Sequence, residues 1–506
     1  MHRNAFIYVA VVLGALAIAL DFASIDLALP ALERQFSLDL ASVQWVINGY
    51  VLAFAVLMVA GGKFADAYGR KKVFLIGMGV FALASLLGGF AWSGASVIAF
   101  RVLQGVGAAM LWPAMIGMAC GAVKDVSPGF VLGLIFGSCS LGNAAGPVVG
   151  GALTEWFSWR WVLWINVPMA FFAIAMTIWK VPEDAASAQR PRNDYAGMAA
   201  LTGGLVALMM VVYQGGGWGW TSAISIGCIA MAVVLIALFP LIERRAVEPL
   251  IPPEIMRSRE MLTLCCCAFV ICQLFFVVLL YFTQYAMKFL GDGPVAGGAR
   301  VVQFMLAYGV VSYFGGPLVK LFGARNLLIG GLIAAAVASA WLGICGPGAS
   351  PISFNGALIL LGISVGAVIP TVSARAIETA GTERASLVSG ITFMCQLSGS
   401  ALMLAVNTAI FTAVSFADLT RVLAAEHRTV TPAESVVISG VISGAQSVHQ
   451  LPAFTAANLP HLAAHLDHAY RNGLEAVLWV SAGLVLIVLL MVLRFVPRRR
   501  PSPETV

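Results

Sequence analysis

The sequence predicts an all-α integral membrane protein. Of its 506 residues, 60% are hydrophobic and only 10% are charged, whereas about a quarter of a soluble protein is charged. The mean hydropathy is +0.94. The apolar residues form runs of about twenty, which is the length of a membrane-spanning helix, and an unpaired strand edge is not tolerated in lipid. We therefore expect a lipid bilayer around the chain and no nucleic-acid partner.

Fourteen apolar runs are long enough to span the membrane. Only His2 and Arg3 precede the first, and no convincing small-residue cleavage site follows it, so we expect a retained span rather than a signal peptide. The expected spans lie near 5–29, 41–61, 73–91, 97–121, 130–152, 161–180, 195–213, 222–242, 261–286, 299–320, 326–345, 354–375, 386–415 and 474–496.

The distribution of Lys and Arg predicts the orientation. An even number of spans puts both termini on one side, and the basic residues concentrate in the terminal segments and the even-numbered loops. The positive-inside rule makes that side cytoplasmic. We expect a multi-pass protein of the cytoplasmic (inner) membrane with both termini inside, and the basic run Arg498–Arg500 as an inner-leaflet anchor.

A short charged stretch, 61–72, separates the second and third spans. Gly62 and Gly69 allow a sharp turn and close approach to a neighbour. Asp66 is the one acid among basic residues that include Arg70, so we predict a conformational latch. The alternative is a set of ordinary positive-inside residues.

A degenerate second copy of this stretch occurs at 316–325, with Lys320 at the position of Asp66. Such a repeat suits two similar halves around a central cavity. We expect an N-terminal six-helix bundle over 1–180, two inserted helices with cytoplasmic linkers over 181–260, and a C-terminal six-helix bundle over 261–506. The last of these contains a long extracytoplasmic loop, 416–473.

Three ionisable residues lie inside predicted spans: Asp21, Asp26 and Arg101. Such residues are costly in lipid and are candidates for function. Asp26 lies about 7.5 Å beyond Asp21 along the helix and points about 140° away from it, so the two are not a paired dyad. We predict that Asp21 faces the cavity, with a structural ion pair as the alternative, and that Asp26 lies at the outer mouth or simply reaches water.

The fifth span carries glycines four residues apart. Gly142, Gly146 and Gly150 form one smooth helix face that permits close packing. Pro147 removes a backbone hydrogen bond and permits a kink, and Gly151 completes the pattern. A generic glycine packing seam is the alternative.

These motifs together resemble those of the major facilitator superfamily, in its fourteen-span drug:proton antiporter branch. The stretch 62–71 resembles the family's loop between helices 2 and 3, and 142–151 resembles its antiporter motif. Asp21–Pro30 resembles the motif of span 1, although this chain has Ala23 where the family usually has Thr, and Asp26 where it has an amide.

Two further stretches carry the same resemblance. Arg101–Gly105 resembles the span 4 motif, whose buried Arg the family ties to proton coupling, and Trp159–Pro168 contains further residues of this branch. The resemblance implies the fold of that superfamily. It also ties Arg101 to proton coupling. We predict Asp21 as the proton carrier and Asp26, which departs from the family's pattern, as a second proton-coupling residue.

The expected function is proton-coupled antiport that exports amphiphilic small molecules by alternating access. A dedicated exporter of one endogenous metabolite and a membrane sensor that transports nothing remain alternatives, and a channel would need no proton-linked carboxylate. Substrate-binding residues stay open, although seven polar residues could line the cavity: Gln44, Asn48, Trp112, Asn143, Gln273, Gln396 and Asn407.

The sequence gives little sign of other chemistry. We find no nucleotide-binding loop or nucleophile elbow and therefore expect neither enzymatic activity nor a cofactor. His461 and His465 could share a helix face, but no Cys is near them, so no metal site is expected. The nine cysteines fall in or beside apolar runs, and we expect no disulfide. The partners are a small-molecule substrate and protons; we expect a monomer and leave a periplasmic adaptor open.

The predicted topology can be tested with reporter fusions. Fusions after Phe64, Arg190 and Arg500 should report the cytoplasm, and a fusion near His427 should report the outside. An outside signal at Arg190 would contradict the fourteen-span arrangement.

Overall fold

The computed structural model describes residues 2–38, 40–122, 127–182, 194–290, 300–346, 350–425 and 459–498. Among these residues, thirteen helices are long and apolar enough to cross a membrane. The bent pair α14 (Val302–Tyr313) and α15 (Gly315–Phe322), with 60° between its parts, makes a fourteenth. The predicted all-α class is therefore confirmed, and the described residues contain fourteen candidate spans when the bent pair is counted as one span.

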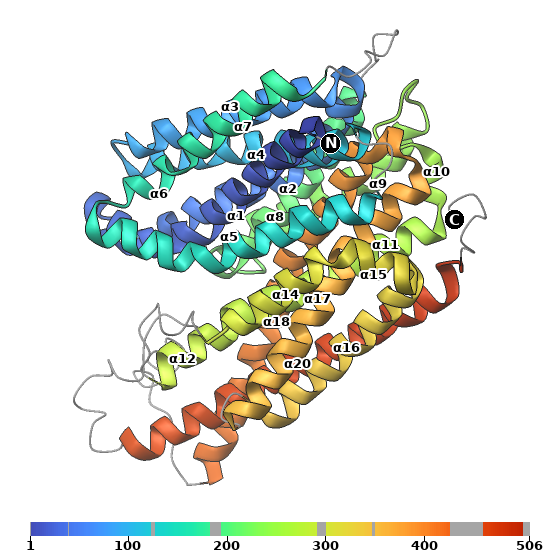
Figure 1. Ribbon diagram of the computed structural model, residues 1–506. Helices are drawn as coiled ribbons and strands as arrows, with labels where there is room; N and C mark the ends of the chain where they lie inside the picture. Colours follow the sequence, from blue (N-terminus) through green and yellow to red (C-terminus); the bar gives the residue numbers. More distant parts are fainter. Residues whose placement is uncertain are drawn as a thin grey trace.

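The first six spans form one group, drawn from blue to cyan in Figure 1. Helix α1 packs along α5 and α7, and α4 packs against α2 and α3. The sixth span is built from two helices, α6 and α7, in direct succession. The bounds are α1 His2–Phe36, α2 Leu40–Tyr68, α3 Arg70–Gly89, α4 Gly94–Ala122, α5 Pro128–Trp156, α6 Arg160–Trp164 and α7 Asn166–Lys180.

The last six spans form a second group, in which α17 packs against α14, α16 and α11, and α20 packs against α16 and α18. The N-terminal end of α1 and the C-terminal end of α20 lie on the same side of the molecule (Figure 1). Besides α14 and α15 the bounds are α11 Arg259–Val277, the π-helix η1 Val278–Phe282, α12 Thr283–Phe289, α16 Ala324–Cys345, α17 Pro351–Ala380, the 3₁₀ turn η2 Thr382–Arg384, α18 Ala385–Ala425 and α20 Leu459–Phe495.

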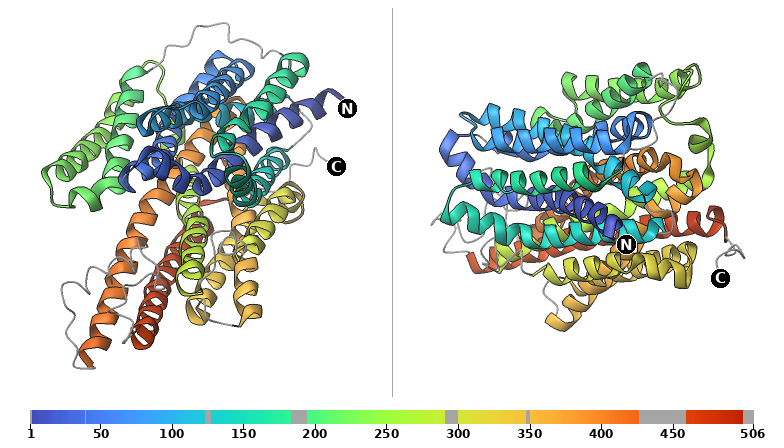
Figure 2. Two further views of the ribbon diagram at one scale, coloured as in Figure 1. Left: turned by 90° about the vertical axis from the view of Figure 1, so that its left-hand side faces the viewer. Right: turned by 45° about the horizontal axis from the view of Figure 1, so that its top comes forward.

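Helices α8 (Tyr195–Trp218) and α9 (Ala223–Glu243) form a hairpin at the periphery, drawn in green in Figure 2. Helix α8 contacts α2 and α18, one from each group. The short helix α10 (Pro253–Arg257) follows, and Lys63 of α2 donates a hydrogen bond of 3.1 Å to the Pro249 carbonyl before it. The division of the chain at 180 and 260 remains a prediction.

Two sequence-based boundaries are wrong. Residues 62–68 are not a loop, because α2 continues to Tyr68 and only Gly69, with φ of 101°, separates it from α3. The loop expected over 416–473 is shorter, since α18 runs to Ala425 and α20 begins at Leu459. The remainder of that loop, the 183–193 linker and Arg499–Arg500 lie outside the described residues.

The glycine face of α5 packs directly on α1. A Cβ atom on Gly142 would come within 2.9 Å of the Ala19 Cβ, and one on Gly150 within 2.5 Å of the Ser24 carbonyl oxygen. A Cβ on Gly146 would overlap Ala23. This seam holds α5 against the part of α1 that carries Asp21, whereas Gly151 has nothing within 4 Å of its Cβ position.

Gly146→Ala is therefore expected to destabilise the protein by about 1–3 kcal/mol, since the added methyl group overpacks the α1–α5 seam. Gly151→Ala is the matched control: it should leave stability unchanged or raise it slightly, because Ala favours the helix over Gly by about 0.5–1 kcal/mol. The apparent melting temperature of the purified variants measures the difference. Equal melting temperatures would contradict the seam.

Candidate functional site

A buried polar cluster surrounds Asp21 inside the N-terminal group of helices. Asp21 and Arg101 are 0% and 1% exposed, and the Arg101 Nη1 atom lies 2.6 Å from the Asp21 Oδ2 atom. The other carboxylate oxygen accepts hydrogen bonds from Gln104 Nε2 at 2.8 Å and Asn166 Nδ2 at 2.7 Å. All three neighbours donate, so the arrangement suits an ionised carboxylate.

Arg101 is held from several sides. Its Nε atom donates to the Val46 carbonyl at 3.0 Å and its Nη1 atom to Gln104 Oε1 at 2.6 Å. The guanidinium lies over the ring of Tyr50, 4.3 Å from the centroid. Gln104 also donates to Ser85 Oγ at 2.8 Å. Helices α1, α2, α3, α4 and α7 thus all contribute, and removing either charged partner would leave the other charge buried and uncompensated.

The structure brings together two of the three predicted proton-coupling residues. Asp21 and Arg101 form a direct ion pair, whereas Asp26 lies on an exposed part of α1. Gln104 and Asn166 belong to the motifs at 101–105 and 159–168, but the sequence did not single them out as candidates. Gln104 is one helical turn from Arg101, and Asn166 is an amide inside an apolar span. Spacing and polarity could therefore have identified both as candidate site residues.

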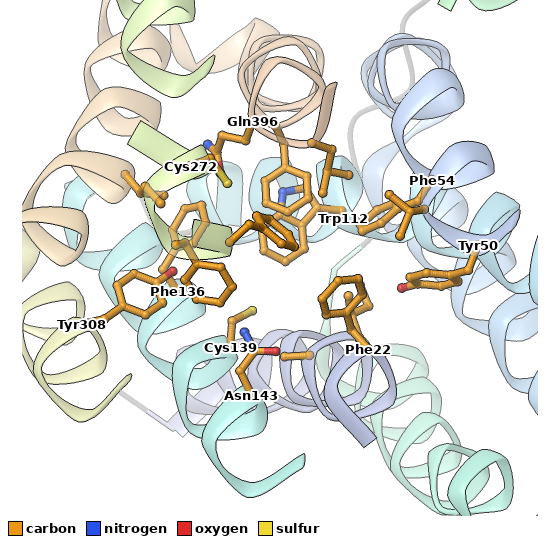
Figure 3. Close-up of a pocket in the computed structure, with 18 residues that line it drawn as sticks. Phe22, Tyr50, Phe54, Trp112, Phe136, Cys139, Asn143, Cys272, Tyr308 and Gln396 are labelled. Carbon is orange, nitrogen blue, oxygen red and sulfur yellow. The ribbon is translucent and has the colours of Figure 1, made fainter. Parts of the chain in front are cut away.

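A cavity of about 100 Å³ lies between the two groups of helices. Eighteen side chains from both groups line it, and nearly all of them are apolar (Figure 3). Asp21 is not among them, which corrects the expectation that this carboxylate faces the cavity: Tyr50 lines the wall, and the ion pair lies behind its ring.

Three of the seven predicted polar residues line this cavity, namely Trp112, Asn143 and Gln396. Two others bind each other instead, because Asn407 Nδ2 donates to Gln273 Oε1 at 2.7 Å. Gln44 and Asn48 are not in the lining.

Aromatic rings from both groups meet at one side of the cavity. The rings of Trp112 on α4 and Phe393 on α18 stack with centroids 4.1 Å apart, and Phe54 and Phe136 pack around them. Trp112 lies five residues before Gly117, whose carbonyl contacts Arg70 at the end of the bundle. The stack therefore lies between the cavity and that end.

Asp66 joins the two groups of helices. Its Oδ1 atom lies 3.0 Å from Arg70, and its Oδ2 atom accepts a hydrogen bond of 2.9 Å from the backbone N–H of Leu387 at the start of α18. Gly62 lies one turn away against the same segment, since a Cβ there would come within 2.6 Å of the Ser386 carbonyl oxygen.

Arg70 completes this junction. Its Nη1 atom donates to the Gly117 carbonyl at 2.9 Å, and its Nη2 atom donates to the carbonyls of Thr382 and Glu383 at 2.7 and 2.8 Å. Gly69 is required for the turn that positions Arg70, because its φ of 101° is strained for any other residue.

The second copy of this stretch makes a similar contact without the acid. A Cβ on Gly316 would come within 2.7 Å of Phe130 on α5, and Gly323 turns the chain with φ of 78°. Lys320 is exposed. The two junctions therefore share close glycine packing, but only the one at Asp66 carries the aspartate.

The family model for the Major Facilitator Superfamily matches residues 11–404. The chain belongs to the major facilitator superfamily. As a member of this superfamily it is a multi-pass membrane transporter rather than an enzyme.

Relatives within the major facilitator superfamily include resistance proteins. The puromycin resistance protein pur8 of Streptomyces alboniger is 31% identical over 86% of each chain. The tetracenomycin C resistance and export protein of Streptomyces glaucescens is 29% identical over 76% of this chain and 71% of its own. The multidrug resistance protein Stp of Mycobacterium tuberculosis is 28% identical over 96% and 91%. These relatives agree with the resemblance to the drug:proton antiporter branch.

Solved structures support the fold. The human organic anion transporter MFSD10 superposes with a TM-score of 0.63 at 12% identity, covering 97% of this chain and 99% of its own. The proton:xylose symporter XylE gives 0.61 at 13% identity, covering 98% and 96%. At such identities the likeness concerns the fold alone.

The junction at Asp66 yields a direct test. Asp66→Asn should keep the protein folded and inserted but weaken the bond to Leu387 and the pairing with Arg70. Hydrogen bonds to charged groups contribute about 1.5–3 kcal/mol, so we expect at least about a tenfold loss in the ratio of closed to open junctions. Labelling of the native Cys120, which is buried on α4 beside Arg70, should speed up accordingly.

Glu383→Gln is the control, because that side chain is exposed and only its carbonyl contacts Arg70. It should leave Cys120 labelling unchanged. Unchanged labelling in Asp66→Asn would show that the junction does not act as a latch.

Proposed function

We propose that this chain is a proton-coupled antiporter that exports amphiphilic small molecules from the cytoplasm by alternating access. The observation that carries the proposal is the buried Asp21–Arg101 ion pair behind the wall of an apolar cavity between the two groups of helices. The names of the resistance proteins among the relatives favour export of toxic compounds over other cargo.

Proton exchange follows from the chemistry of the cluster. An ionised Asp21 accepts three hydrogen bonds and neutralises Arg101. A proton on this carboxylate removes the attraction and leaves a buried guanidinium without its counter-charge, which is costly. The helices that hold Arg101 must then rearrange or admit water, so binding of a proton changes the relative stability of the two access states.

Coupling to the substrate runs through shared structure. Tyr50 contacts Arg101 on one side and lines the cavity on the other. A substrate in the cavity and a proton on Asp21 therefore favour different arrangements of the same helix, which makes the two compete. The junction of Asp66 and Arg70 holds one end of the cavity shut, and its opening exposes the cavity to that side.

The orientation and assembly belong to the same proposal. The Asp66 junction faces the cytoplasm, both termini lie on the cytoplasmic side of the inner membrane, and the chain acts as a monomer. Asp26, which is exposed, lies toward the outer mouth and can serve as a second proton acceptor. An exporter of one endogenous metabolite fits the same geometry, and growth across a panel of toxic compounds, with and without the protein, distinguishes a broad from a narrow substrate range.

The charge of the cargo decides how it is driven. One charge crossing 100 mV corresponds to about 2.3 kcal/mol, or a concentration ratio of about fifty for a neutral substrate exchanged for one proton. A monovalent cation exchanged for one proton moves no net charge and responds to the pH gradient alone. We therefore expect neutral or singly cationic substrates, and poor export of bulky dications.

Asp21→Asn should abolish uphill export while the protein remains in the membrane, because the side chain keeps its size but can no longer exchange a proton. Asp26→Asn is the matched control on the same helix and should do less harm. Vesicles with an imposed pH gradient measure both variants, with the amount of inserted protein determined in parallel. Full substrate-linked proton flux in Asp21→Asn would refute the assignment.

A further inference from the structure

The wall of the central cavity contains three polar atoms that lack a hydrogen-bond partner. They are the Tyr50 hydroxyl, the Trp112 Nε1 atom and the Gln396 Nε2 atom. Each is buried from solvent and has no hydrogen-bond partner among the residues that the structure describes. Tyr50 and Trp112 belong to the N-terminal group and Gln396 to the C-terminal group. The three side chains therefore line one cavity from both halves (Figure 3).

All three atoms can donate a hydrogen bond. An indole N–H can only donate a hydrogen bond, an amide –NH₂ can only donate, and a phenol hydroxyl can donate or accept. Buried donors without partners are costly, and a ligand that supplies acceptors removes that cost. None of the eighteen side chains that line the cavity is charged, so no side chain of this wall can form an ion pair with a charged ligand.

The remaining surface favours flat rings. Trp112 stacks on Phe393, and Phe54 and Phe136 lie beside them. The cavity of about 100 Å³ is smaller than the roughly 300–1,000 Å³ of drug-sized sites, so a substrate must part these rings as it enters. Aromatic ligands can replace the stacking contacts that such a movement breaks.

We propose that the substrates are uncharged ring compounds whose polar atoms are hydrogen-bond acceptors, such as ketone, ester or ether oxygens, and that Tyr50, Trp112 and Gln396 donate to them. This specificity rests on the proposed function, in which the central cavity is the transport site. It narrows the cargo from amphiphilic molecules in general to acceptor-rich neutral ones.

Tyr50 also contacts Arg101, so substrate recognition at its hydroxyl can affect the Asp21–Arg101 ion pair. Its hydroxyl points toward the space enclosed by the lining side chains (Figure 3), while its ring lies under the guanidinium of Arg101. A substrate that accepts from this hydroxyl therefore fixes the ring against which Arg101 rests. Recognition of an acceptor and the state of the Asp21 ion pair then depend on the same side chain.

A matched pair of ligands tests the proposal. 9-Fluorenone and fluorene have the same tricyclic shape, but only fluorenone carries a carbonyl oxygen. Binding of each to the purified full chain in lipid nanodiscs, measured by calorimetry without any gradient, should give a dissociation constant about fivefold lower for fluorenone, as expected for one net hydrogen bond. The monocation 9-aminoacridinium should bind more weakly than fluorenone.

Three variants each remove one donor: Trp112→Phe, Tyr50→Phe and Gln396→Leu. At least one should reduce the preference for fluorenone to less than about twofold, and measurable binding of fluorene to that variant reports an intact cavity. Trp164→Phe is the control, because that indole already donates to the Leu86 carbonyl and does not line the cavity. It should leave the preference unchanged.

Equal affinities for the two ligands in the unmodified chain would overturn the proposal, and so would a preference that survives in all three variants or a stronger affinity for 9-aminoacridinium. These measurements involve no proton gradient and no change at Asp21. A fluorenone preference together with gradient-independent transport would therefore leave the specificity standing and refute the antiport mechanism alone.

Discussion

The ion pair between Asp21 and Arg101 constrains the whole N-terminal group of helices. Two full charges lie where water does not reach, so their attraction and their hydrogen bonds must together offset a large desolvation cost. Five helices converge to supply those partners. Any change in the protonation of Asp21 alters a balance on which the packing of all five depends, and such sensitivity is what a proton-coupled transporter requires.

Close helix packing makes this arrangement possible. The glycine face of α5 lets α1 approach without side chains between them, and this fixes the segment that carries Asp21. Glycines also form both junctions between the halves, with Gly62 against Ser386 and Gly316 against Phe130. Only the first junction has an aspartate, Asp66, so its closure depends on charge as well as on fit.

Much of this could be predicted from the sequence. The length and apolar character of the runs gave the fourteen spans, and spacing indicated the roles of Gly62, Gly69 and the glycines of α5. The continuation of α2 through Gly62 to Tyr68 could not be predicted from the sequence. Glycine and charged residues normally favour a loop, and here the contact with α18 overrides that preference. The position of Asp21 behind Tyr50 could not be predicted either. Helical spacing gives the relative directions of the side chains on α1, but it does not say which neighbouring helix each side chain faces. The same holds for the unpartnered donors of the cavity, which depend on packing between distant segments.

Proton-coupled antiport requires that Asp21 carries a proton that substrate binding displaces. The most direct measurement is proton release from the purified protein in weakly buffered solution, on addition of the compound most strongly exported in the growth panel. We expect release of up to one proton per chain from protein whose Asp21 is protonated before the compound is added, and none from Asp21→Asn at equal occupancy. Substrate binding without proton release, or undiminished release from Asp21→Asn, would contradict it.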